Sequence, residues 1–283
     1  VEQIVPTYSM KKIIFFFPFL ILSCYKGQKK VQNLIEIDFQ YINQKIVIPV
    51  EIDNEIYKFC LDTGGKTSIS SELNIKLNPK AEYEINISDA NDHGGIMKSV
   101  LLDSLKIGGI NFLNINALAY DFGKIFECFE YDGYIGSDLL LDYIVQIDLH
   151  TNKIRFSKDI NLLTLDKSKA QEMVLISDQG SPYVWVHFDD NEKPFKDFVM
   201  VDTGMKGIYD LSLDTYERLL KNQRIKLIAE GEGSATVGVF GISEKKSQYL
   251  FYFPEFSIGN FSVKNYVNYG TYASNSRIGS ELL

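Results

Sequence analysis

The sequence predicts an all-β protein with two pseudo-symmetric lobes, each built as a β-barrel, and a few short helices. Short runs rich in Val, Ile, Tyr and Phe alternate with Gly, Asn and Asp, which is typical of strands joined by turns. An internal repeat divides the chain into halves of matching order. With 283 residues, 45% of them hydrophobic, the chain can bury one large core or two moderate ones.

The repeat consists of four blocks in each half. A strand candidate is followed by a polar turn and a second strand candidate, and that second strand ends in the tripeptide Asp-Thr-Gly. Because the blocks keep the same order in both halves, they indicate two lobes of the same architecture. The matching blocks, first half before second, are residues 45–50 and 183–188, 56–61 and 198–201, 105–112 and 256–261, and 134–140 and 277–283.

The tripeptide is the element that carries chemistry. It occurs as Asp62-Thr63-Gly64 and again as Asp202-Thr203-Gly204. A single Asp-Thr-Gly after a strand is also an ordinary turn signal. Two carboxylates on equivalent turns, however, are what a proton-sharing pair that activates water requires.

On these residues the chain resembles the retropepsin-like and pepsin-like aspartic peptidases, over most of residues 37–283. The resemblance implies that Asp62 and Asp202 are the catalytic carboxylates. The supporting residues that it implies are the threonines that lock the two turns together, the glycines that allow a close backbone approach, and a hydrophobic pair plus Gly that braces each turn. These supporting residues are Thr63, Gly64, Thr203, Gly204, Ile135, Gly136, Ile278 and Gly279. Arg277, the first residue of the second bracing segment Arg277-Ile278-Gly279, departs from the family's hydrophobic pattern.

The resemblance also assigns a flap hairpin to each half. Both Gly-rich stretches fall between an Asp-Thr-Gly turn and the next repeat block, and the second lacks the Gly-Lys-Ser/Thr ending of a phosphate-binding loop. The alternative interpretation is a pair of ordinary mobile hairpins. The flap residues are His93, Gly94, Gly95, Gly233 and Gly238.

The implied function is an aspartic endopeptidase that hydrolyses an extended peptide or protein substrate with an activated water and no cofactor. We expect no metal, because the three histidines lie far apart without ligand spacing. We expect no nucleic-acid partner, because the formal net charge is -8. The expected state is a monomer with an intramolecular pseudo-dimer. The alternatives are a non-catalytic envelope lipoprotein that binds a peptide or partner protein on the same scaffold, and a tethered structural β protein with two accidental turns.

The amino terminus predicts a membrane-anchored lipoprotein of the bacterial cell envelope, on its periplasmic or cell-surface side. Residues 10–23 are typical of a signal peptide, and they end in Ile-Leu-Ser before Cys24, which resembles a lipobox with Cys24 as the lipidated residue. A plain secretory signal or a buried amphiphile stays open. Residues 1–9 are expected to be upstream sequence or a misassigned start, and residues 24–36 a solvated tether.

The remaining boundaries follow from the repeat. We expect lobes over residues 37–160 and 173–283, joined by a linker over 161–172, with the second lobe incomplete because the first continues for about twenty residues after its matching block. Helices are expected at 70–73, 137–143 and 213–220, and a hairpin at 144–149 with 153–156. Cys60 and Cys128 are expected to be buried free thiols, although a disulfide stays open.

Overall fold

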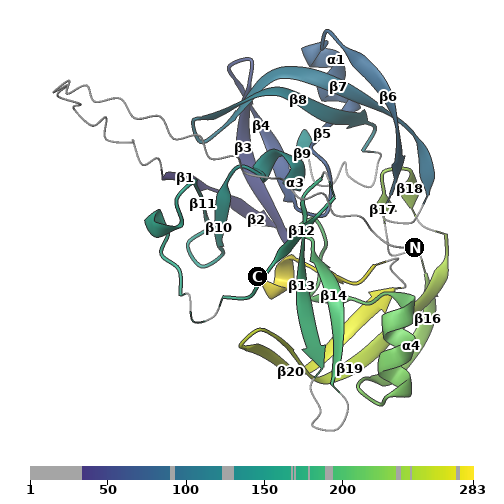
Figure 1. The fold of residues 1–283 in the computed structure, drawn as a ribbon. Helices are drawn as coiled ribbons and strands as arrows, with labels where there is room; N and C mark the ends of the chain where they lie inside the picture. The colour runs from purple at the N-terminus through teal and green to yellow at the C-terminus, as the bar shows by residue number, and fades with distance from the viewer. Residues whose placement is uncertain are drawn as a thin grey trace, which may run out of the picture. The chain divides into compact units, whose positions relative to one another are not determined.

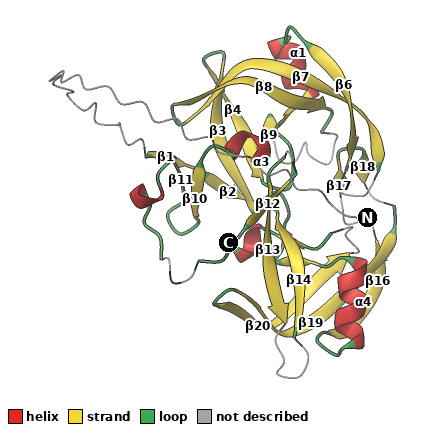
Figure 2. Ribbon diagram, in the orientation of Figure 1, coloured by secondary structure: helices red, strands yellow, loops and turns green. Residues whose placement is uncertain are grey.

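The computed structural model confirms the predicted all-β, two-lobed fold (Figures 1 and 2). It describes residues 34–283 except 90–92, 123–130, 167, 169, 178, 189–193, 234–236, 243 and 272–274. The predicted signal peptide, Cys24, Cys128 and most of the tether therefore lie outside the described residues.

The first lobe is an eight-stranded sheet that closes on itself, because β3 pairs with β7 as well as with its neighbours along the sheet. Side chains from its inner face form one core that includes the fully buried Ile46, Phe59 and Leu105. In sheet order its strands are β2 (Gln40–Ile42), β3 (Lys45–Ile52), β4 (Glu55–Asp62), β9 (Gly133–Gly136), β5 (Ser68–Ser70), β8 (Ile110–Tyr120), β7 (Gly94–Ile107) and β6 (Glu82–Ser88).

The second lobe repeats this arrangement with its own core, in which the aromatic rings of Phe188, Tyr209 and Phe253 stack. Asn268 on β20 donates a side-chain hydrogen bond to the carbonyl of Tyr209 on β15, which joins strands that have no ladder between them. In sheet order the strands are β15 (Tyr209–Asp210), β21 (Arg277–Ile278), β14 (Phe195–Val201), β13 (Ser181–Phe188), β19 (Lys246–Ile258) and β16 (Lys226–Gly233), with β12 (Val174–Ile176) on β13 and β20 (Phe261–Thr271) on β19.

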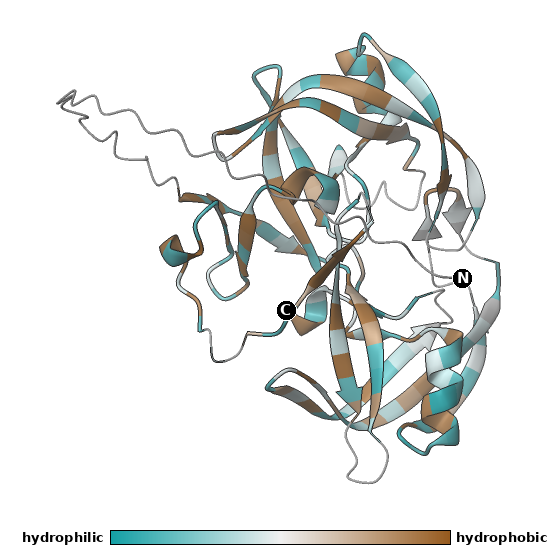
Figure 3. Cartoon of the chain, viewed as in Figure 1, coloured by the Kyte–Doolittle hydropathy of each residue, from teal (hydrophilic) through white to brown (hydrophobic). Residues whose placement is uncertain are grey.

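Two smaller sheets complete the described strands. β1 (Ile35–Asp38), β11 (Lys153–Ser157) and β10 (Ile144–Asp148) form a three-stranded sheet, and the last two are the hairpin predicted after the first brace. β17 (Val237–Gly238) and β18 (Gly241–Ile242) form a short hairpin. Figure 3 shows hydrophobic and hydrophilic residues in bands along the strands, as expected where one face of a sheet packs on a core.

The helices are short and begin at the predicted places. Ser70 and Ser212 cap α1 (Ser71–Leu77) and α4 (Leu213–Lys221) by accepting hydrogen bonds from backbone N–H groups of the first turn. α3 (Ser137–Leu140) follows the first brace and is shorter than predicted, because the chain turns into β10 after it. Two 3₁₀ turns cover Ile160–Leu162 and Ser280–Leu282.

The structure corrects one boundary. β1 begins at Ile35, two residues inside the predicted tether, because Ile35 and Glu36 pair with Phe156 and Arg155 of β11.

The described residues contain no helix long and apolar enough to cross a membrane. Residues 173–176 of the second lobe, around the edge strand β12, are exposed hydrophobics. The expected incompleteness of the second lobe stays a prediction.

Candidate active site

The two Asp-Thr-Gly turns leave equivalent positions of the two lobes. Asp62 is the last residue of β4, and Asp202 directly follows β14. Each strand runs parallel to the strand that carries its brace, with Leu61 beside Ile135 in the first lobe and Val201 beside Ile278 in the second. The matching register places the two carboxylates at equivalent points.

The threonines join the two turns by a reciprocal set of hydrogen bonds. The N–H of Thr63 donates to Oγ1 of Thr203 at 3.0 Å, and the N–H of Thr203 donates to Oγ1 of Thr63 at 3.0 Å. Each hydroxyl in turn donates to a carbonyl of the opposite lobe, Thr63 to Val201 at 2.6 Å and Thr203 to Leu61 at 2.8 Å. All four donors are satisfied across the lobes, so the turns are held rigidly against each other.

The glycines bring each turn against the opposite carboxylate. A Cβ atom at Gly64 would overlap the carboxyl group of Asp202, and a Cβ atom at Gly204 would overlap that of Asp62. The N–H of Gly64 also donates to Oδ1 of Asp62 at 3.0 Å. The structure therefore brings Asp62 and Asp202 together at the lobe interface, and a side chain at either glycine would separate them.

The braces lie under the turns. Ile135 and Ile278 are buried in the two cores, and a Cβ atom at Gly136 or Gly279 would overlap a backbone carbonyl of the neighbouring turn. The serine that follows each of these glycines also bonds the turn, since Ser137 Oγ donates to the carbonyl of Thr63 at 2.5 Å and Ser280 Oγ lies 3.2 Å from that of Met205.

The pair holds a proton at unusually high pH. Burial, followed by the charge of Asp202, raises the pKa of Asp62 to about 7, and the hydrogen bond between the two carboxyl groups acts in the same direction. The charge of Lys45 and the N–H of Gly64 oppose the shift without cancelling it. One carboxyl group of the pair is therefore protonated up to about neutral pH.

Arg277 takes part in the site, which the sequence pattern did not predict. Its Nη1 lies 3.6 Å from Oδ2 of Asp202, and the two side chains are only 13% and 8% exposed. The residue that breaks the hydrophobic pattern thus forms a nearly buried ion pair with one member of the Asp pair. Tyr134 occupies the same position in the first lobe.

The two predicted flap hairpins contact each other. The N–H of Phe240, in the β17–β18 turn, donates to Oδ2 of Asp89 at 3.3 Å, and a Cβ atom at Gly95 would overlap the Phe240 ring. Asp89 and His93 close the other hairpin, because the N–H of His93 donates to Oδ1 of Asp89 at 3.0 Å. Gly94 lies at the start of β7 beside this turn.

The remaining flap glycines lie on the second hairpin. Gly233 ends β16, and Gly238 pairs with Gly241 in the β17–β18 ladder. Among the described residues, no hydrogen bond joins any of the five predicted flap residues to Asp62 or Asp202, so their connection to the site is through the hairpins that carry them.

Two further residues lock the lobes together, and sequence patterns did not identify them. Gln179, in the turn before β13, donates from Nε2 to the carbonyl of Gly64 at 2.9 Å. Gln44, in the turn before β3, accepts through its carbonyl from Oγ of Ser280 at 2.5 Å. In each lobe, the turn before the first strand of the repeat thus contacts the other lobe. The equivalent position of Gln44 and Gln179, each before the first repeat block, is the sequence signal that could have identified them.

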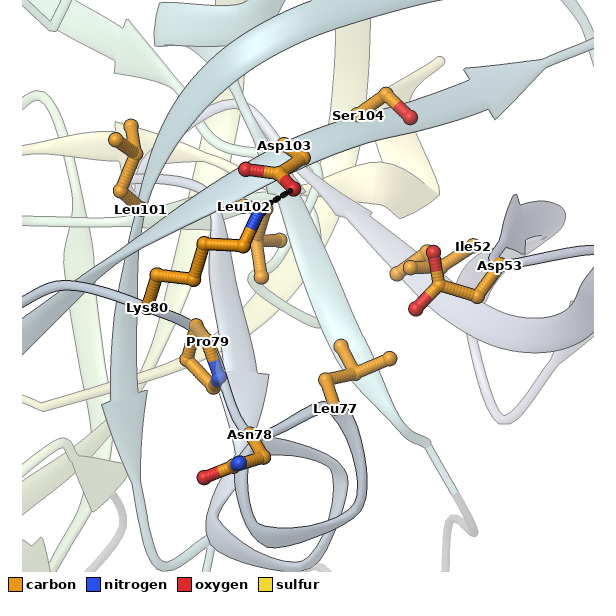
Figure 4. A pocket seen from close by; sticks show the side chains of 10 residues that line it. All are labelled: Ile52, Asp53, Leu77, Asn78, Pro79, Lys80, Leu101, Leu102, Asp103 and Ser104. Carbon is orange, nitrogen blue, oxygen red and sulfur yellow. Dashed lines mark hydrogen bonds and ion pairs between the residues drawn. The ribbon is translucent and has the colours of Figure 1, made fainter.

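Other candidate residues lie apart from the pair. Cys60 is a buried free thiol, and burial raises its pKa, so it is expected to stay protonated and unreactive. No group of acidic, His and Cys side chains suited to a metal occurs among the described residues. A hollow of about 230 Å³ on the first lobe, crossed by the 3.0 Å ion pair of Lys80 and Asp103, is lined by neither Asp62 nor Asp202 (Figure 4).

Comparison with known proteins gives only distant similarity, to solved structures. No protein-family model matches the chain, and no curated protein matches it. Among solved structures, the chain is similar to a retropepsin-like aspartic protease from Rickettsia conorii, with 20% identity and a TM-score of 0.34, over 44% of this chain and 92% of that chain.

Proposed function

We propose that this protein is an aspartic endopeptidase. The observation that carries the proposal is the meeting of Asp62 and Asp202 at a lobe interface held by the reciprocal Thr63 and Thr203 hydrogen bonds. Two carboxyl groups this close cannot both ionise without cost, so they share a proton and titrate as a coupled unit. Such a pair supplies a base and an acid at once.

This pair supports hydrolysis of an amide bond by direct attack of water, without a covalent intermediate between substrate and protein. The ionised carboxylate accepts a proton from a water molecule while the water oxygen bonds to the scissile carbonyl carbon, and the protonated carboxyl donates its proton to the carbonyl oxygen. The resulting gem-diol collapses as the C–N bond breaks and the leaving nitrogen is protonated. The substrate is an extended peptide held between the Asp pair and the two flaps.

The test is peptide cleavage by the full-length chain beside its Asp62→Asn and Asp202→Asn variants. We expect cleavage of a mixed peptide library by the wild type over a range of pH, and its loss in both variants with the thermal transition retained, because either change removes the base or the acid. Substantial cleavage by either folded variant would place the chemistry elsewhere.

A second candidate function is peptide or protein binding without cleavage. The Arg277–Asp202 ion pair favours it, because a cation that neutralises one carboxylate is also a way to make a close acidic pair tolerable in a binding scaffold. One experiment distinguishes the two candidate functions. A binding protein would retain library peptides intact at every pH, whereas a peptidase would release fragments that mass spectrometry identifies.

We also propose that Cys24 anchors the protein in a bacterial envelope membrane through a lipid. The support is the lipobox-like run Ile21-Leu22-Ser23-Cys24 after an apolar segment. Mass spectrometry of the mature chain tests this. A lipid-modified Cys24 at the amino terminus, and release from membranes in Cys24→Ser, are expected, and an unmodified terminus at another residue would refute the anchor.

A further inference from the structure

The two carboxyl groups of the Asp pair lie in different surroundings although their backbones are equivalent. The strand beside β4 places Tyr134 next to Cys60, and the strand beside β14 places Arg277 next to Met200. Tyr134 belongs to a buried apolar and aromatic cluster with Cys60, Phe122 and Tyr131. The repeat therefore carries aromatic rings on the Asp62 side and a cation on the Asp202 side.

We propose that Arg277 holds Asp202 as the carboxylate, so that Asp62 carries the proton that the pair shares. This inference rests on the proposed peptidase function and divides its two roles. Asp202 is then the base that accepts the proton of the attacking water, and Asp62 is the acid that donates to the carbonyl oxygen. Arg277 is a positioning residue, because it acts through Asp202.

The contacts of Asp202 support its role as the base. Its Oδ2 faces Arg277 Nη1 at 3.6 Å, and an opposite charge at this range favours the ionised form. Its Oδ1 is buried and has no hydrogen-bond partner among the described residues. One oxygen thus faces the cation, and the other meets no donor from the described part of the protein, as expected of the oxygen that accepts a proton from a water molecule.

The surroundings of Asp62 favour the neutral form. Burial and the negative charge of Asp202 are the two largest influences, and together they raise the pKa of Asp62 to about 7. Two residues whose environments push them toward opposite protonation states are the usual mark of an acid and base assignment.

The other charged groups around the pair do not reverse this division. Lys45, at the start of β3, lowers the pKa of Asp62, but its influence ranks below burial and the charge of Asp202. Asp210 on β15 is the register partner of Arg277 on β21, so it is the second acidic residue on the same face as the cation. Arg277 therefore lies between two acidic positions, and Asp202 is the one in the catalytic pair.

The division of roles gives a balanced reaction. Water gives a proton to Asp202 as its oxygen bonds to the carbonyl carbon, and Asp62 gives its proton to the carbonyl oxygen. In the second step the C–N bond breaks, Asp202 passes its proton to the leaving nitrogen, and Asp62 recovers a proton from a gem-diol hydroxyl. Both residues finish in their starting states.

The test is the titration of the two carboxyl groups by NMR of the full-length chain labelled with ¹³C at Asp carboxyl carbons. The resonances are assigned by their loss in Asp62→Asn and Asp202→Asn. In the wild type we expect the Asp62 carboxyl to be protonated and the Asp202 carboxyl ionised at pH 6. The reverse occupancy, or equal occupancy of the two, would overturn the proposal. This measurement needs no substrate, so its outcome is independent of whether the wild type cleaves peptide.

Variants at Arg277 test the cause. In Arg277→Met, which keeps the length of the side chain and removes its charge, we expect protonation of Asp202 to move upward by about 1 to 3 pH units. Arg277→Lys, which keeps the charge, should titrate like the wild type. A folded Arg277→Met chain with an unchanged Asp202 titration would overturn the role of Arg277. Should Arg277→Met fail to fold, the wild-type and Lys titrations still decide the proposal.

A kinetic readout complements the titration if the wild type is active. Removing the cation should move both limbs of the pH profile of kcat/KM to higher pH, because the two limbs report the coupled pair. A residue with a purely structural role would lower the melting temperature and leave the limbs in place. Absence of cleavage by the wild type at every pH would refute the peptidase function and leave the NMR result to decide the charge assignment.

Discussion

Thr63 and Thr203, 140 residues apart in the sequence, exchange backbone-to-hydroxyl hydrogen bonds in both directions at 3.0 Å. The N–H of each threonine donates to the other's hydroxyl oxygen, and each hydroxyl donates a hydrogen bond to a carbonyl of the opposite lobe. The exchange joins two separate hydrophobic cores at the point where the carboxylates meet. The same hydrogen bonds therefore stabilise the contact between the lobes and hold Asp62 and Asp202 together.

Replacing Thr203 with Val should destabilise the fold by about 2 to 4 kcal/mol. The change keeps the shape of the side chain but leaves the N–H of Thr63 and the carbonyl of Leu61 without their partners, and each unsatisfied buried group costs about 1 to 3 kcal/mol. Urea denaturation measures the difference. Thr203→Ser, which keeps the hydroxyl, is the control, and equal losses in the two variants would contradict the role of the hydrogen bonds.

Folding stability should fall as pH rises from about 4 to about 7. The pKa of Asp62 is raised from 3.8 to about 7 in the native protein, so the folded state binds this proton more tightly than the unfolded chain does. The stabilisation is fully present below the unfolded pKa and is lost as pH rises through the folded pKa, with a slope of up to about 1.4 kcal/mol per pH unit.

The matched variants isolate this contribution. Asp62→Asn should flatten the dependence between pH 4 and 7 and be more stable than the wild type at pH 8, because it removes one member of the like-charge pair. Asp103→Asn, at an exposed ion pair far along the chain, should keep the wild-type slope. Denaturation midpoints across the pH range give the comparison, and the same slope in all three proteins would rule out Asp62 as its source.

On the proposed function, the contact between the two predicted flap hairpins should affect substrate binding more than folding. Phe240→Ala removes the ring that lies against Gly95, while Phe240 is 38% exposed and contributes little to either core. We expect KM for a cleaved peptide to rise severalfold with a nearly unchanged melting temperature. Phe261→Ala, at the exposed first residue of β20, is the control and should leave KM unchanged. A KM equal to that of the wild type in Phe240→Ala would show that the flap contact has no part in binding.

Activity should not return when the Asp62→Asn and Asp202→Asn proteins are mixed. Both carboxylates come from one chain, and each inactive chain supplies only one of them to its own site. Cleavage by the mixture, compared with the same total amount of wild type, is the measurement. Recovery to about a quarter of the wild-type rate would indicate that lobes of different chains combine as in a dimer, because random exchange makes about half of the dimers mixed and each mixed dimer has one intact site of two.

Local patterns in the sequence were sufficient for most of the secondary structure. The strands before each Asp-Thr-Gly turn and the helices after the turns depend on neighbouring residues, and they occur close to where they were predicted. The repeat also indicated two lobes of the same architecture, and the structure shows the same parallel pairing in both, with Leu61 beside Ile135 and Val201 beside Ile278.

Contacts between residues distant in sequence needed the tertiary structure. In the sequence, Arg277 is only an exception to a hydrophobic pattern. The parallel pairing of β21 with β14 places its guanidinium group beside Asp202. The contact of Phe240 with the other predicted flap hairpin likewise joins segments far apart in the sequence, and local propensity does not predict such a contact. The sequence by itself determined the strands, the turns and the presence of two carboxylates, because these follow from short-range spacing. Only the folded chain decided which charge lies beside which carboxylate, because the electrostatic environment of a buried group depends on burial and distances across the lobes.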